Sequence, residues 1–145
     1  MKAVIKAICI SKERGTAKQK VDEARFIENY GIEGDAHAGN WHRQISLLSF
    51  EKVEELRARG AEVLDGAFGE NILAEGIDFK TLPIGAHIKA GDVELEVTQI
   101  GKKCHSECEI FHQVGDCIMP REGIFAKVLK GGILKIGDTM YVQEV

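Results

Sequence analysis

The sequence lacks several features that would define its class at once. No apolar run is long enough to cross a bilayer, and Met1 to Lys6 is not followed by the apolar region and cleavage site of a signal peptide. Nineteen basic residues against twenty-three acidic ones give a net charge of −4, without the basic excess typical of nucleic-acid or anionic-membrane binding. We therefore expect a cytoplasmic protein that has neither nucleic acid nor membrane as a partner.

Cysteine and proline are also scarce. The 145 residues include four cysteines, and a disulfide framework is not expected in a cytoplasmic chain of this size that can build its own core. We expect reduced cysteines that serve as packing residues, metal ligands or reactive thiols. Only two prolines are present, and neither a linker nor a low-complexity tract divides the chain. We therefore expect one domain over residues 1–145.

Glycine is abundant, and its distribution indicates the fold class. Sixteen glycines lie between short apolar runs, which is typical of short strands joined by tight turns. Lys2 to Ile10 is rich in valine and isoleucine with imperfect alternation, and residues 93–98 alternate strictly between apolar and polar. These patterns predict a mostly β protein, a small closed or nearly closed barrel with one or two short helices.

The strongest helix signal covers Phe50 to Arg59. Ser49 is expected to cap its first amides, and Gly60 is expected to end it. Its apolar residues form one stripe, so we expect the helix to cover the barrel as a lid or plug. Two similar stretches, at 87–97 and 133–145, run through Gly-Asp into an alternating segment. We interpret both as ordinary hairpins.

Three of the four cysteines lie in GKKCHSECEIFHQVGDC, residues 101–117. Cys9 lies in an apolar run and is expected to pack in the core. In the segment, three interpretations stay open: a reactive Cys104, a metal site and simple packing. Nearby positive charge from Lys102 and Lys103 would favour a Cys104 thiolate. The alternative metal site uses four residues at spacings unlike the familiar zinc patterns, namely Cys104, Cys108, His112 and Cys117.

Two glycine-rich stretches carry further candidate site residues. In YGIEGDAHAGNWHRQISLL, residues 30–48, His37 can exchange a proton and Arg43 can bind an anionic oxygen, whereas an Asp35–Arg43 ion pair in an ordinary loop is the structural alternative. In GAFGENILAEGID, residues 66–78, Glu70 and Asn71 follow a glycine turn. They suit either recognition of a hydrogen-bonding heterocycle or fastening of one loop to the next, and we favour fastening.

The order of the blocks GIEGDAHAG, RQISLLS, GAFGENI, LPIGAHIKAGDVELEVTQIGKKC and GIFAKVLKGGILKIGD resembles the MOSC domain, named after the C-terminal part of molybdenum cofactor sulfurases. The likeness runs from about residue 4 to residue 143 and is to the small stand-alone bacterial kind. It implies a β-barrel of the MOSC or pyruvate kinase barrel type. It also implies a role in molybdenum cofactor metabolism, with Cys104 carrying sulfur as a persulfide.

The resemblance also implies which residues line the cofactor cleft. They are Asp35, His37, Arg43, Gln44, Glu70, Asn71, Lys102 and Lys103. The expected cofactor is molybdopterin or a precursor, and the expected partners are a cysteine desulfurase-type sulfur donor and a molybdoenzyme or cofactor-biosynthesis acceptor. No pyridoxal phosphate site is expected in this chain. The alternative is a non-catalytic cofactor carrier or a metal-binding module that uses Cys104, Cys108 and Cys117.

Many MOSC proteins have proline directly before the cysteine, where this chain has Lys103. Lysine adds a charge that favours the thiolate at Cys104. Cys108 and Cys117 exceed the single-cysteine pattern, and either thiol exchange with a persulfide or a shared metal would give them a role.

Overall fold

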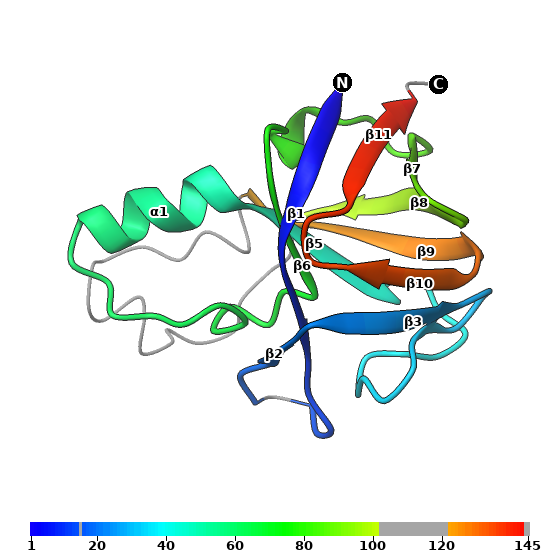
Figure 1. Ribbon diagram of the computed structural model, residues 1–145, viewed down its shortest axis with the longest axis horizontal. Helices are drawn as coiled ribbons and strands as arrows, with labels where there is room; N and C mark the ends of the chain where they lie inside the picture. Colours follow the sequence, from blue (N-terminus) through cyan, green and yellow to red (C-terminus); the bar gives the residue numbers. More distant parts are fainter. Residues whose placement is uncertain (15, 102–121, 144–145) are drawn as a thin grey trace.

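The computed structural model describes residues 1–14, 16–101 and 122–143. Its main sheet closes into a ring of seven strands (Figure 1). In order around the ring, the strands are β1 (Lys2–Ile10), β11 (Thr139–Gln143), β7 (His87–Ala90), β8 (Val93–Ile100), β9 (Ile124–Lys130), β5 (Ile45–Ser49) and β6 (Ile72–Glu75). Antiparallel pairing of β1 with β11 completes the barrel. The prediction of a mostly β barrel is confirmed.

Two further sets of strands extend the barrel. β2 (Gln19–Val21) pairs with the second half of β1, past the part that pairs with β11. A separate three-stranded sheet contains β10 (Gly132–Lys135), β3 (Glu23–Ile27) and β4 (Gly31–Ile32). In Figure 1, β10 and β3 of this sheet lie alongside β9, and β2 lies near one end of β3.

The side chains of β1 divide between two hydrophobic cores. Ile5 and Ile8 belong to the core inside the barrel, whereas Ala7 and Cys9 belong to a second core outside it. The register of β1 against β6 shifts between Ile5 and Ala7, which marks a bulge. A bulge adds one residue and therefore reverses which positions face inward. This explains the imperfect alternation in the sequence. In β8 the alternation is regular, and Val93, Leu95 and Val97 are buried as predicted.

The helix α1 (Phe50–Ala58) covers the second core. Its buried residues Val53 and Leu56 pack with Leu48 and Leu73, on the outside of β5 and β6 (Figure 1). Gly60 has φ of +105° and ends the helix as predicted. The predicted cap by Ser49 is wrong. Its hydroxyl donates to the Ile77 carbonyl at 2.6 Å and accepts from the Phe79 amide at 3.2 Å, so it fastens the short 3₁₀ helix η1 (Phe79–Thr81) instead.

Of the two predicted hairpins, one is confirmed and the other is wrong. β7 and β8 pair from His87↔Glu96 to Ala90↔Val93 around the Gly91 turn. In contrast, β10 pairs with β3, and β11 pairs with β1 and β7. The turn at Gly137 therefore passes the chain from one sheet to the other. The Gly137 amide donates to the Ile5 carbonyl at 2.8 Å, which ties this turn to the β1 bulge.

Within the described ranges, no helix is long and apolar enough to span a lipid bilayer.

Candidate functional site

A fully buried ion pair lies at the centre of the GDAHAG stretch. Lys18 Nζ is 2.7 Å from Asp35 Oδ1, and both side chains have an exposed fraction of 0%. The predicted alternative, an Asp35–Arg43 pair, is wrong, because Arg43 bonds to Gln99 instead. Lys18 was not among the residues singled out from the sequence. It precedes β2, whereas Asp35 follows β4, so the pair joins two short edge strands.

The Lys18 ammonium has three acceptors. Besides Asp35, it contacts Ser11 Oγ at 3.3 Å and His37 Nδ1 at 2.9 Å. An ammonium has three N–H donors and no acceptor, so this arrangement uses all of them. Asp35 is also well satisfied. Its Oδ1 accepts from the Ser11 amide at 3.1 Å, and its Oδ2 accepts from the His37 amide at 3.3 Å. The cluster is therefore a connected polar network at the edge of the barrel.

His37 is held through its backbone as well as through its ring. Its carbonyl accepts the indole N–H of Trp41 at 2.7 Å. The Trp41 ring in turn lies under the Arg14 guanidinium at 5.2 Å and edge-on to the His42 ring at 5.7 Å. Loop residues 35–42 thus have a defined conformation, with His37 at their centre.

Arg43 and His42 converge on a single acceptor. Gln99 Oε1 accepts from Arg43 Nε at 3.0 Å and lies 2.9 Å from His42 Nε2. The Arg43 guanidinium also lies 5.1 Å above the Phe125 ring. The bond to Gln99 uses Nε alone, and the two terminal nitrogens of Arg43 make no hydrogen bond within the described part of the chain. A guanidinium presented in this way suits an anionic oxygen.

The Gln44 side chain forms hydrogen bonds inside the protein. Its side chain is 0% exposed, its Oε1 accepts from the Val128 amide at 2.9 Å, and its Nε2 donates to Asn29 Oδ1 at 3.3 Å. These bonds connect the residue before β5 with β9 and with the turn after β3. Both the oxygen and the nitrogen of this buried amide are therefore already bonded within the protein.

Asn71 is bonded in the same way. Its Oδ1 accepts from both the amide and the hydroxyl of Ser46, at 2.9 and 3.1 Å, and its Nδ2 donates to the Cys9 carbonyl at 3.0 Å. Asn71 is 1% exposed. The side chain therefore joins β1, β5 and the start of β6, which matches the fastening role favoured from the residues alone.

The Glu70 side chain stabilises the turn that precedes it. Its two carboxylate oxygens accept from the amides of Gly66 and Phe68, at 2.9 and 3.0 Å. Burial raises the pKa of the Glu70 carboxyl to about 7, although these amide bonds lower it. The turn reaches the ion pair through Gly66, whose carbonyl accepts from the Lys18 amide at 3.0 Å. Glu70 therefore contributes to the position of Lys18.

The cysteines divide between described and undescribed parts of the chain. Cys9 is fully buried, and burial raises the pKa of its thiol to about 12, with Glu70 adding to the effect. It is a packing residue, as predicted. The predicted residues Lys102, Lys103, Cys104, Cys108, His112 and Cys117 lie outside the described residues. Among the described residues, no group of three or more histidine, cysteine or acidic side chains is placed to hold a metal ion.

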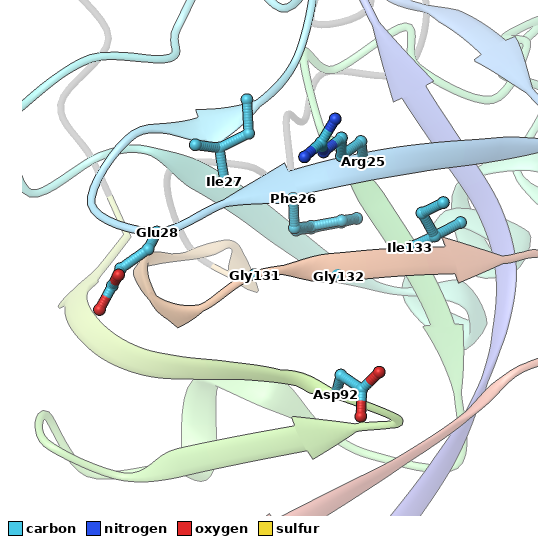
Figure 2. Close-up of a pocket in the computed structure, with 8 residues that line it drawn as sticks. All are labelled: Arg25, Phe26, Ile27, Glu28, Asp92, Gly131, Gly132 and Ile133. Atoms are coloured by element: carbon cyan, nitrogen blue, oxygen red, sulfur yellow. The ribbon is translucent and has the colours of Figure 1, made fainter.

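Two surface hollows occur in the part of the chain that the structure describes. One of about 580 Å³ lies between β3, β10 and the β7–β8 turn. Figure 2 shows its Gly131 and Gly132 between Phe26 on β3 and Asp92 on the turn. A Cβ at Gly131 would lie 2.5 Å from the Phe26 carbonyl oxygen, so that glycine serves close strand packing. None of the predicted site residues lines this hollow.

The second hollow, of about 520 Å³, adjoins the Lys18 cluster. Ser11, one of the Lys18 acceptors, belongs to its wall, and the wall also contains Lys12 and Lys20. No local feature of the sequence indicates a site role for either Ser11 or Lys18. Both stand in a polar stretch that is typical of an exposed turn, and only the pairing of β1 with β2 brings them under the Asp35 loop.

Comparison with solved structures shows the fold. The YuaD protein from Bacillus subtilis aligns with a TM-score of 0.84 at 22% identity, covering 100% of this chain and 97% of that one. YiiM from Escherichia coli aligns with a TM-score of 0.70 at 17% identity, covering 100% and 71%. YiiM from Geobacillus stearothermophilus aligns with a TM-score of 0.65 at 21% identity, covering 98% of this chain and 73% of that one. At these identities the likeness concerns the fold alone.

A search of curated proteins found no match to the chain. The family model described as the MOSC domain matches residues 33–141, about three quarters of the sequence. The matched range begins two residues before Asp35 and ends inside β11, so it contains the polar loop and most of the barrel. This chain belongs to the MOSC domain family.

Proposed function

We propose that this protein carries sulfane sulfur on Cys104 for molybdenum cofactor metabolism and holds an anionic cofactor next to it. The MOSC domain is associated with molybdenum cofactor metabolism, which supports the general role. The proposed sulfur donor is a cysteine desulfurase-type protein, and the proposed acceptor is a molybdoenzyme or a cofactor-biosynthesis protein.

The observation that carries the proposal is the shared contact at Gln99. This residue lies near the end of β8, and it holds His42 and Arg43 at 2.9 and 3.0 Å. Cys104 follows Gly101, just past the end of this strand, by three residues in the sequence. The proposal therefore takes the sulfur carrier and the Arg43 guanidinium to act at the same end of β8.

The described residues fit an anionic group of the cofactor at Arg43. Its terminal guanidinium nitrogens match the paired oxygens of a phosphate, and its Nε bond to Gln99 fixes the plane of the fork. When bound, molybdopterin would supply the dithiolene sulfurs that ligate molybdenum. Gln44, Glu70 and Asn71 support the loops around this position through their bonds to the backbone.

The sulfur transfer proposed for Cys104 is a thiol exchange without net oxidation. The Cys104 thiolate attacks the outer sulfur of a donor persulfide, a new S–S bond forms, and the donor sulfur leaves as a thiolate. Lys102 and Lys103 would favour the attacking thiolate through their positive charge. The reverse exchange delivers the outer sulfur to the acceptor.

Cyanolysis tests this directly. The protein is loaded with a cysteine desulfurase and cysteine, freed of small thiols, and treated with cyanide, which releases sulfane sulfur as thiocyanate. About one equivalent is expected for the wild type and none for Cys104→Ser. Cys9→Ser is the matched control, because Cys9 is fully buried and should not carry sulfur. Equal thiocyanate from Cys104→Ser and the wild type would overturn the proposal.

The same preparations separate the alternatives. Stoichiometric zinc or iron in protein purified without chelator, lost together in Cys104→Ser, Cys108→Ser and Cys117→Ser, would favour the metal-binding module over the sulfur carrier. Bound molybdopterin with no cyanide-labile sulfur would favour the non-catalytic cofactor carrier.

A further inference from the structure

The environment of the Lys18 ammonium determines the chemistry of His37. Lys18 Nζ lies 2.7 Å from Asp35 Oδ1 and 2.9 Å from His37 Nδ1, and the ion pair is fully buried. At 2.7 Å from a buried carboxylate, the amine is held as a charged ammonium. A charged ammonium only donates hydrogen bonds. His37 Nδ1 must therefore be the acceptor in this contact.

An accepting Nδ1 has one consequence for the neutral ring. The proton of a neutral imidazole resides on the nitrogen that is not accepting, which here is Nε2. Protonating Nδ1 as well would place an N–H against the ammonium at 2.9 Å and bring two positive charges together. Asp35 itself is already bonded to Lys18 and to two backbone amides.

We propose that Lys18 is a positioning residue that holds His37 as the neutral Nε2–H tautomer. His37 then acts as a fixed hydrogen-bond donor and does not carry protons. The sequence alone predicts that His37 can exchange a proton, because it does not reveal the contact with Lys18.

The backbone around Lys18 is built to keep the ammonium in place. Its amide donates to the Gly66 carbonyl at 3.0 Å, and Gly66 is held by Glu70 at 2.9 Å. A Cβ at Gly66 would lie 2.2 Å from the Lys18 carbonyl oxygen, so the two segments are in direct contact. His37 is fixed from the other side by Asp35 and Trp41. Neither partner can shift without breaking bonds to other elements.

Nitrogen-15 NMR of the intact wild-type protein tests the assignment. Long-range proton–nitrogen correlations distinguish the two neutral tautomers and the imidazolium, and His37→Gln identifies the signals of this ring among the five histidines. At neutral pH we expect an unprotonated Nδ1 and a protonated Nε2. A ring protonated at Nδ1, alone or together with Nε2, would overturn the proposal.

A variant then tests the cause. Lys18→Met combined with Asp35→Asn removes both buried charges together, so it avoids leaving one of them unpaired. In this folded double variant we expect the His37 signals to move toward a mixture of tautomers. The control Lys20→Met changes the neighbouring exposed lysine and should leave the His37 pattern unchanged. An unchanged Nε2–H pattern in the double variant would show that Lys18 does not set the tautomer.

The NMR test of the His37 tautomer does not depend on sulfur transfer at Cys104. Cyanolysis reports on Cys104, whereas the nitrogen shifts report on His37 in protein without ligand. A wild type that lacks cyanide-labile sulfur but shows the Nε2–H pattern would overturn the proposed function and leave the role of Lys18 supported. The converse result would overturn the role of Lys18 alone.

Discussion

Asp35 and Glu70 are both buried carboxylates, but they are stabilised in different ways. Asp35 has a lysine ammonium at 2.7 Å in addition to two backbone amides. Glu70 accepts hydrogen bonds from the backbone amides of its own turn, and burial raises its pKa to about 7. Gly66 connects them, since its amide bonds to Glu70 and its carbonyl to Lys18. The two carboxylates therefore differ in their surroundings: Asp35 has a counter-ion in direct contact, whereas at Glu70 backbone amide bonds oppose the effect of burial.

Removing the counter-ion should have the largest effect. Lys18→Met leaves the Asp35 carboxylate buried and unpaired, and we expect a loss of about 3–5 kcal/mol in the free energy of unfolding. Adding Asp35→Asn should recover much of that loss. Urea unfolding of the single variants and the double variant forms a complete cycle. Additive losses would mean that the two charges do not depend on each other.

Glu70 should make stability depend on pH. Its pKa is raised from 4.5 to about 7 in the folded protein, so the folded state holds the proton over a range where the unfolded state has lost it. The stabilisation is full below pH 4.5 and is lost as the pH rises to about 7. At about 1.4 kcal/mol per pH unit this amounts to about 3 kcal/mol.

Glu70→Gln does not titrate, so it should remove this part of the pH dependence. The measurement is the difference in unfolding free energy between wild type and variant from pH 4 to pH 8. Parallel curves across that range would show that Glu70 keeps its ordinary ionisation in the fold.

Alanine substitutions at two glycines of the same turn distinguish the effect of backbone strain from the effect of contact with Lys18. Gly66 and Gly69 both have positive φ, +93° and +82°. A Cβ at Gly66 would meet the Lys18 carbonyl at 2.2 Å, whereas nothing lies within 4 Å at Gly69. The left-handed backbone destabilises both alanine variants. Gly66→Ala should lower the free energy of unfolding by about 1–3 kcal/mol more than Gly69→Ala. Equal thermal unfolding temperatures for the two variants would contradict the contact.

The smallest effect is expected at Lys20. Its ammonium lies 3.5 Å from Asp65, and its side chain is 51% exposed. Exposed pairs contribute about 0–1 kcal/mol, so Lys20→Met should scarcely alter urea unfolding. A loss as large as that of Lys18→Met would mean that burial does not distinguish the two lysines.

The barrel could be predicted from the sequence because its signals are local. The alternation of Val93, Leu95 and Val97 needs no partner strand to be visible, and a glycine at position 60 ends a helix wherever the helix lies. The second Gly-Asp turn was misread because strand pairing is not local. Gly137 bonds to Ile5, more than a hundred residues away, and its flanking strands enter different sheets.

The candidate site was predicted less completely for the same reason. Ser49 has the right position for a helix cap, but the distant Ile77 and Phe79 take its hydroxyl. Lys18 stands among polar residues in TAKQK, and nothing nearby in the sequence indicates that it is buried. Asp35 and His37 were identified through their own chemistry, whereas the lysine that bonds to both depends on three separate segments folding together.

The pairing of β1 with β11 has a consequence for synthesis on the ribosome. On one edge of β1, Lys2, Ala3 and Val4 pair with Tyr141, Met140 and Thr139. Because translation proceeds from the N-terminal side, this edge of β1 has no partner until β11 has emerged. We expect vectorial folding to leave that edge exposed to aggregation or chaperones, and a circular permutant that joins these strands by a short turn should shorten the wait.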